Sequence, residues 1–173
     1  KLIGFNALAA ERMVKAESGE RKDEDRLTKG PAYGETPDPS SLIPRPPTDW
    51  PTYRYDGQRS GRSPCEIPRD LQLRWQAEIG GGLSSLTAAD GRVCVAAIDR
   101  HAVIALDAES GCPAWRFTAA ARVDSPPTLD QGHALFGCRD GSVYRVRGSD
   151  GVLAWRLQAG RETRRIVVRG QLE

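Results

Sequence analysis

Few side chains in this sequence have the types and spacing that chemistry needs, and the clearest are Arg122 and Asp124 in "ARVDSPPT". A carboxylate two residues from a guanidinium, where an apolar run begins, can bind a polar ligand or a cofactor. The same two groups can also form a salt bridge at the end of a strand, which contributes little stability when exposed. Both interpretations stay open, and Asp124 and Arg122 are the candidate cofactor-binding residues.

Histidine and cysteine form no recognisable site. His101 and His133 each stand alone beside a turn and are interpreted as surface or strand-edge polar residues. The four cysteines are Cys65, Cys94, Cys112 and Cys138. No CxxC pair and no histidine at zinc-ligand spacing is present, so we expect no metal site. Cys94 and Cys138 lie in apolar runs and are interpreted as small buried residues, while the disulfide state of all four stays open.

The sequence also lacks a glycine-rich phosphate loop and a nucleophile motif, so it predicts no catalytic residue. Its 173 residues are enough for one domain with a core, and its 25 basic and 23 acidic side chains nearly balance. This balance gives no reason to expect nucleic acid as a partner. No apolar run approaches the roughly 20 residues of a membrane helix, so we expect no membrane insertion in this segment.

The amino-acid composition of the chain changes along its length. Residues 1–48 are dense in charge and then in proline, and they hold too few apolar residues to offset the entropy of ordering them. We predict a flexible linker there, followed by a lead-in segment over residues 49–70 and a folded region over residues 71–173.

The folded region consists of short apolar runs separated by Asp-Gly and Ser-Gly turns, a pattern typical of antiparallel strands. We predict an all-β fold. The expected strands of the first half are Ser84–Ala89, Arg92–Ile98, Ala102–Asp107 and Ala114–Ala119. Those of the second half are Ser125–Asp130, His133–Cys138, Ser142–Arg147 and Ala154–Gln158.

These two sets are copies of one unit. Trp75, Trp115 and Trp155 are spaced by forty residues, and the two later ones follow Gly111 and Gly151 by four. Upstream of the third strand the spacing becomes forty-one. A four-stranded unit of this size matches one blade of a β-propeller, with blades at about residues 78–119 and 120–160. We interpret the tryptophan as a rigid wedge between blades, its N–H bonded to a backbone carbonyl.

The turn before each wedge tryptophan has its own chemistry. Glycine supplies the tight turn between the third and fourth strands. Asp107 and Ser110 are placed to accept hydrogen bonds from local backbone N–H groups. We therefore assign a structural docking role to six residues: Asp107, Ser110, Gly111, Trp115, Gly151 and Trp155.

The stretch "ALDAESGCPAW" resembles the tryptophan-docking repeat of pyrroloquinoline-quinone-type (quinoprotein-like) β-propellers, A-x-D-x-x-T-G-x-x-x-W. The second copy departs from it, with Arg147 and Asp150 at the Asp and Thr positions. The segment from Asp49 to Ser63 is similar to the lead-in of bacterial proteins of this group, in which Trp50 and Tyr53 would anchor the chain.

The resemblance implies the fold more strongly than a function, because this propeller serves dehydrogenases, assembly scaffolds and sensors. Quinone-dependent members use a calcium ion held by Glu, Asn and Asp, an Asp base and, often, adjacent cysteines. This sequence has no adjacent cysteines, and its only asparagine is Asn6. No cofactor is evident in this chain, while the quinone remains possible in a parent protein.

Two blades do not close a ring, since closure needs at least four. We therefore expect part of a longer propeller whose partners are the remaining blades and other proteins. The resemblance implies a binding or scaffold module of a periplasmic or extracellular bacterial protein. The alternatives are part of a quinone-dependent dehydrogenase, and a sensor domain attached to a membrane enzyme.

Overall fold

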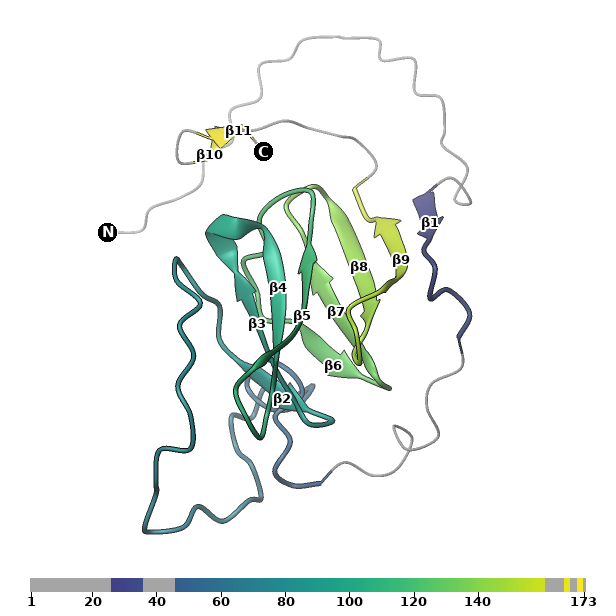
Figure 1. The fold of residues 1–173 in the computed structure, drawn as a ribbon. Coiled ribbons are helices and arrows are strands. Elements are labelled where there is room, and N and C mark those ends of the chain that lie inside the picture. Colours follow the sequence, from purple (N-terminus) through teal and green to yellow (C-terminus); the bar gives the residue numbers. More distant parts are fainter. Residues whose placement is uncertain (1–25, 36–45, 161–166, 169–170, 173) are drawn as a thin grey trace, which may run out of the picture.

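The structure is a computed structural model that describes residues 26–35, 46–160, 167–168 and 171–172. Two antiparallel sheets pack face to face in the described part of the chain (Figure 1). We call the four-stranded sheet blade 1 and the five-stranded sheet blade 2. In the residues described, no helix is long and apolar enough to cross a membrane.

Blade 1 is a simple meander in which each strand pairs with the next. Its strands are β2 (Thr87–Ala89), β3 (Arg92–Ala97), β4 (Ala102–Asp107) and β5 (Pro113–Thr118). A short 3-10 turn, Ile98–Arg100, joins β3 to β4. The register between β4 and β5 shifts by a bulge after Ala105.

Blade 2 repeats this meander and adds one strand. It holds β6 (Thr128–Asp130), β7 (His133–Gly137), β8 (Ser142–Arg147) and β9 (Leu153–Gln158), with β1 (Leu27–Lys29) outside β9. Its β8–β9 bulge follows Arg145, forty residues after the bulge of blade 1. A separate two-stranded hairpin joins β10 (Val167–Val168) to β11 (Gln171–Leu172).

The all-β prediction is confirmed, and the strands occur where the repeat placed them. β8 and β9 follow β4 and β5 by forty residues, and β6 and β7 follow β2 and β3 by forty-one. The one-residue difference therefore lies in the turn between the second and third strands. The first strand of each blade is shorter than expected and begins at Thr87 or Thr128.

Residues 26–35 differ from the linker expected over residues 1–48. This segment forms β1 and a following turn, and Ala32 is 1% exposed. Composition alone did not reveal the strand, because its backbone hydrogen bonds go to β9, more than a hundred residues away in the sequence. The rest of the expected linker up to residue 45 lies outside the described residues.

The main core lies between the two blades. Val103, Ala105 and Trp115 of blade 1 are buried against the inner face of blade 2. On that face the rings of Phe136 and Tyr144 stack at 5.5 Å, and Phe117 of blade 1 meets both edge-on. Such offset and edge-to-face pairs give aromatic rings a defined geometry as well as buried area.

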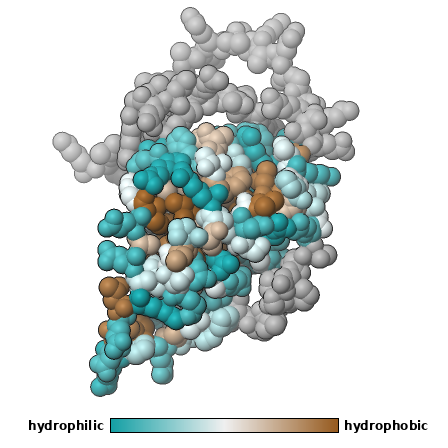
Figure 2. Space-filling model, viewed as in Figure 1, coloured by the Kyte–Doolittle hydropathy of each residue, from teal (hydrophilic) through white to brown (hydrophobic). Residues whose placement is uncertain are grey.

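A second, smaller cluster lies on the other face of blade 1. There Val95, Ile104 and Leu106 are covered by Trp75 and Ile79, from the segment that precedes β2. Further back in this segment, Leu71 and Leu73 are 73% and 81% exposed. Figure 2 shows apolar atoms at the lower left of the molecule, over the segment that leads towards β2 in Figure 1.

Candidate functional site

The tryptophan contacts are the most regular feature of the structure. The indole of Trp115 lies on Gly151, so closely that a Cβ on this glycine would come within 2.7 Å of the ring. The indole N–H of Trp115 donates to the carbonyl of Gly148 at 2.7 Å. Trp115 therefore joins the fourth strand of blade 1 to the last turn of blade 2.

Trp75 makes the same contacts one unit earlier. Its ring lies on Gly111, where a Cβ would come within 2.5 Å, and its N–H donates to Ala108 at 3.0 Å. In both cases the glycine follows the tryptophan by thirty-six residues. The sequence interpretation connected each tryptophan with the glycine four residues before it and missed this partner. A spacing of thirty-six is the signal that would have found it.

The turn between β4 and β5 is closed by Asp107. Its Oδ1 accepts hydrogen bonds from the backbone N–H groups of Glu109 and Ser110 and from the Ser110 hydroxyl, at 2.9 to 3.1 Å. Ser110 Oγ in turn accepts from the N–H of Cys112 at 3.3 Å. The hydrogen bonds from Ser110 hold the pKa of Asp107 below its ordinary value.

The corresponding turn of blade 2 uses an ion pair instead. Arg147 occupies the position of Asp107 and donates to both carboxylate oxygens of Asp150, at 2.9 and 2.6 Å. Asp150 also accepts from the N–H of Val152 at 3.1 Å, and these bonds lower its pKa. The remaining guanidinium nitrogen of Arg147 pairs with Glu35, beyond β1.

The candidate cofactor-binding residues Arg122 and Asp124 lie together in a network of charges. Arg122 is 7% exposed and lies 3.4 Å from Asp124 and 3.4 Å from Asp99 of blade 1. Asp124 pairs in addition with Arg139, which lies in the turn after β7. This arrangement balances charge across the ends of the two blades. Arg122 and Asp124, the two groups that a ligand would bind, are thus already paired with other side chains of the protein.

The lead-in segment lies beside the first strand of each blade, β2 and β6. Trp50 exchanges two backbone hydrogen bonds with Ala88 of β2, and the carbonyl of Pro51 accepts from Leu129 of β6 at 2.7 Å. The hydroxyls of Thr52 and Thr128 are 2.9 Å apart. The innermost strand of each blade is thus hydrogen-bonded to the chain's own lead-in.

Of the two residues expected to anchor the lead-in, Trp50 and Tyr53, only Trp50 does so. Trp50 is held as described, but Tyr53 is 47% exposed and does not anchor the segment. Tyr55 takes that place, with its ring 5.4 Å from that of Trp50 in an edge-on arrangement. Residue 54 has a positive φ of 58°, and so does Tyr55, at 81°. This tight turn directs Tyr55 rather than Tyr53 at Trp50.

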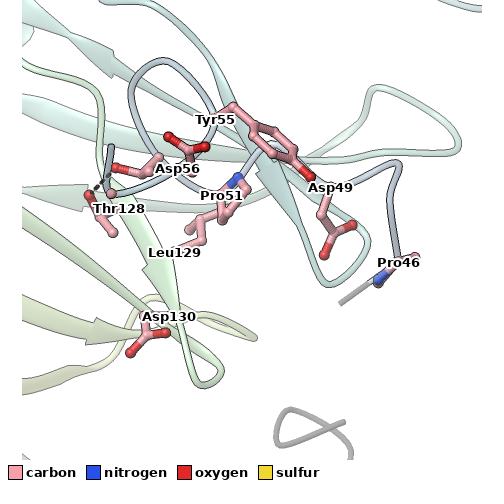
Figure 3. Close-up of a pocket in the computed structure, with 10 residues that line it drawn as sticks. Pro46, Asp49, Pro51, Tyr55, Asp56, Thr128, Leu129 and Asp130 are labelled. Atoms are coloured by element: carbon pink, nitrogen blue, oxygen red, sulfur yellow. Dashed lines mark hydrogen bonds between the residues drawn. The ribbon is translucent and has the colours of Figure 1, made fainter. Parts of the chain in front are cut away.

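A pocket of about 440 Å³ lies between the lead-in and β6. Figure 3 shows that the side chains of Asp49, Asp56 and Asp130 come from three different parts of its wall, with Tyr55 above Pro51. The carboxylates make the pocket more suitable for a cationic group than for an anion. Asp56 also accepts the N–H of Ser60 at 2.9 Å, which lowers its pKa.

The histidines and cysteines make no joint site. His133 is buried, contrary to the surface position considered for it, and its Nδ1 lies 2.7 Å from the carbonyl of Gln131. Cys94 is fully buried, as expected, whereas Cys138 is only partly buried and packs against the main core. All four cysteines, each within the described residues, are free thiols. Within that part of the chain no three acidic, His or Cys side chains converge to hold a metal ion.

The comparison with known families agrees with this geometry. The family model described as "Outer membrane protein assembly factor BamB", which is built on PQQ-like repeats, matches residues 67–172, more than half of the chain. The chain belongs to the PQQ-like β-propeller repeat family. The β-propeller fold inferred from the tryptophan repeat is thereby confirmed.

Among curated proteins, the chain is 33% identical over 109 residues to the DNA damage-responsive serine/threonine-protein kinase RqkA of Deinococcus radiodurans. That match covers 61% of this chain and 16% of the kinase. The chain therefore corresponds to a small part of this relative.

Solved structures show the same fold. The quinohemoprotein alcohol dehydrogenase of Comamonas testosteroni is 21% identical, with a TM-score of 0.57 over 77% of this chain and 24% of that one. The quinohemoprotein alcohol dehydrogenase ADHIIG of Pseudomonas putida HK5 is 17% identical, with a TM-score of 0.53 over 73% of this chain and 22% of that one.

Proposed function

We propose that this chain is a propeller-repeat module that serves as a binding or scaffold domain in a larger, exported bacterial protein. Its immediate partners are the remaining blades of the ring, because two blades cannot close one. The family membership supports the repeat architecture. The exported location and the scaffold role rest on the resemblance to outer-membrane assembly proteins, and fractionation of cells that produce the full-length protein tests the location.

One observation carries the non-catalytic role. The innermost strands of a propeller face its central channel. Here the lead-in, at Trp50 and Pro51, already hydrogen-bonds to both innermost strands. The polar pair Arg122 and Asp124 is likewise engaged by charges from both blades. A channel cofactor would have to displace the chain's own groups.

The alternative is part of a quinone-dependent dehydrogenase, and a binding experiment separates the two. The full-length protein, which contains the remaining blades, is titrated with pyrroloquinoline quinone and calcium, and binding is followed by tryptophan fluorescence and calorimetry. We expect no saturable binding in the micromolar range. Micromolar affinity that is lost in Asp124→Ala and kept in the exposed control Asp70→Ala would overturn the proposal and favour the dehydrogenase.

The likeness to the kinase RqkA supports a second candidate, a sensor module attached to an enzyme. The identity of 33% extends over 109 residues, 61% of the chain, and the relative is described as responsive to DNA damage. If this candidate is correct, the natural full-length protein transfers phosphate from ATP to serine or threonine. Absence of transfer by that protein would exclude a kinase parent and leave the scaffold proposal standing.

A further inference from the structure

The two blades differ at their outer edges. In blade 1 the sheet ends at β5, and no strand of the described residues pairs with its outer side. In blade 2 the equivalent strand β9 pairs with β1, in the register Leu27 to Leu157 and Lys29 to Trp155. Figure 1 shows β1 lying alongside β9 at the side of the molecule away from blade 1.

The contact extends past the strand and is closely fitted. The N–H groups of Gly30 and Ala32 donate to the carbonyls of Ala154 and Leu153 at 2.9 and 3.0 Å. A Cβ on Gly30 would collide with the backbone carbonyl of Leu153, so only glycine fits there without movement. Two residues later the side chain of Ala32 is 1% exposed, which leaves no room for a larger one.

Charged groups hold both ends of this segment. At its start, the guanidinium of Arg26 donates to the carbonyls of Gln158 and Ala159 at 3.0 and 3.1 Å. At its end, the carboxylate of Glu35 pairs with Arg147. The segment is therefore held at both ends as well as along β1 and at Ala32.

Arg147 explains why the second repeat departs from the motif. The first repeat has Asp107 at this position, where it closes its own turn. In blade 2 Asp150 holds two nitrogens of Arg147, which fixes the guanidinium and directs its third nitrogen at Glu35. A planar guanidinium fixed in this way is suited to bind a carboxylate.

We propose that the outer edge of β9, together with Arg147, is a docking site for an extended peptide segment. The backbone of β9 supplies the binding, as in other cases of strand addition, and three side-chain positions supply the selectivity. The site accepts a glycine, a small apolar residue two positions after that glycine, and a carboxylate five positions after the same glycine. Residues 26–35 of the same chain occupy it through Gly30, Ala32 and Glu35. This inference goes beyond the proposed function and does not depend on it.

The first test removes the glycine. In the full-length chain, Gly30→Ala should release the segment. Hydrogen exchange of the amides of residues 27–30 and 32 should then become roughly ten-fold faster or more, because local opening controls their exchange. The matched control is Gly57→Ala, where a Cβ meets nothing within 4 Å. Equal exchange in the two variants would overturn the proposal.

The second test exchanges the charges. Glu35→Lys leaves the turn of blade 2 intact and should speed the same exchange about two- to five-fold, as expected for an exposed ion pair. Combining it with Arg147→Glu and Asp150→Arg should restore slower exchange, since the contact to residue 35 and the ion pair that closes the turn are then both reversed. The control Glu109→Lys breaks the exposed pair of Glu109 with Arg74 in blade 1 and should change nothing at residues 27–32. If exchange is not slowed again, the proposal that Arg147 binds the carboxylate of the segment is wrong.

The third test supplies the segment separately. A fluorescent synthetic peptide of residues 26–35, at concentrations up to about 1 mM, should bind the Gly30→Ala chain and should bind the wild-type chain less, because its own segment competes at high effective concentration. Binding to neither chain would refute the docking site. A stable dimer of the wild-type chain in light scattering would overturn the assignment of the occupant to the same chain.

Discussion

Blade 1 and blade 2 are copies of one forty-residue unit that reach the same turn by different chemistry. In blade 1, Asp107 closes the turn with three hydrogen bonds from neighbouring residues. In blade 2, Arg147 and Asp150 form an ion pair across it. Both turns nevertheless keep a glycine with a φ near +70°, at Gly111 and Gly151. Each of these glycines lies under a tryptophan of the preceding unit.

The comparison separates the parts of the repeat by their physical role. Glycine is required at this position for two reasons. Its backbone conformation is costly for other residues, and its missing side chain makes room for the indole. The polar residues of the turn only have to satisfy local donors and acceptors, which several combinations can do. Because several combinations are possible, the turn of blade 2 can have Arg147 where blade 1 has Asp107, and Arg147 also pairs with Glu35.

The largest expected effect tests the tryptophan contacts. Trp115→Ala should lower the free energy of unfolding by about 3–5 kcal/mol, because it removes a large side chain from between the blades. Trp75→Ala should cost less, since Trp75 is only partly buried. Urea denaturation of the two variants measures the difference. If the order were reversed, the segment before β2 would hold blade 1 more strongly than blade 2 does.

The second prediction separates backbone strain from the indole contact. Gly91, Gly111 and Gly151 all have a φ of 70° to 75°, but a Cβ on Gly91 meets nothing within 4 Å. Gly91→Ala should therefore cost only about 1–2 kcal/mol of left-handed backbone strain. Gly111→Ala and Gly151→Ala should cost roughly 1–3 kcal/mol more, through overpacking against the tryptophan. Equal losses in all three, by the same denaturation, would contradict the docking role of the glycines.

The third prediction distinguishes the two turns by pH and salt. The folded pKa of Asp107 is lowered below 3.8, so its stabilising effect is full above about pH 3.8 and is lost as the pH falls through the folded pKa. The gap in Tm between wild type and Asp107→Asn should shrink accordingly in acid. At neutral pH that gap should narrow less with salt than the gap for Arg147→Gln, because salt screens ion pairs. Asp107 has one ion-pair contact, with Arg92 at 3.3 Å, beside its three hydrogen bonds, whereas Arg147 pairs with both Asp150 and Glu35. Similar salt dependence of both gaps would show that the turns do not differ in kind.

The smallest effect concerns the thiols. Burial raises the pKa of Cys94 in blade 1 to about 12, and burial also raises that of Cys138 in blade 2. Iodoacetamide at pH 8 should therefore modify exposed Cys112 well before Cys94, since the thiolate is the reactive form. Mass spectrometry of the digested protein follows the order. Early modification of Cys94 would mean that β3 opens easily.

Much of the fold could be predicted because it is local and repeated. Alternating apolar residues and Asp-Gly turns placed β4 and β8 with their correct bounds, and the spacing of forty and forty-one residues gave the two blades. The candidate site could be predicted less well. Arg122 and Asp124 were singled out as a pair, but their partners Asp99 and Arg139 come from turns that the sequence does not connect.

The sequence by itself determined the repeat, since strand periodicity, turn residues and a recurring tryptophan each depend on neighbours within one unit. Tertiary structure alone decided what lies across units: that Trp115 rests on Gly151, that Tyr55 rather than Tyr53 packs on Trp50, and that residues 27–29 form a strand. The last case shows the reason clearly. β1 has no core of its own, and its backbone groups are satisfied only by an edge strand that the chain forms more than a hundred residues later.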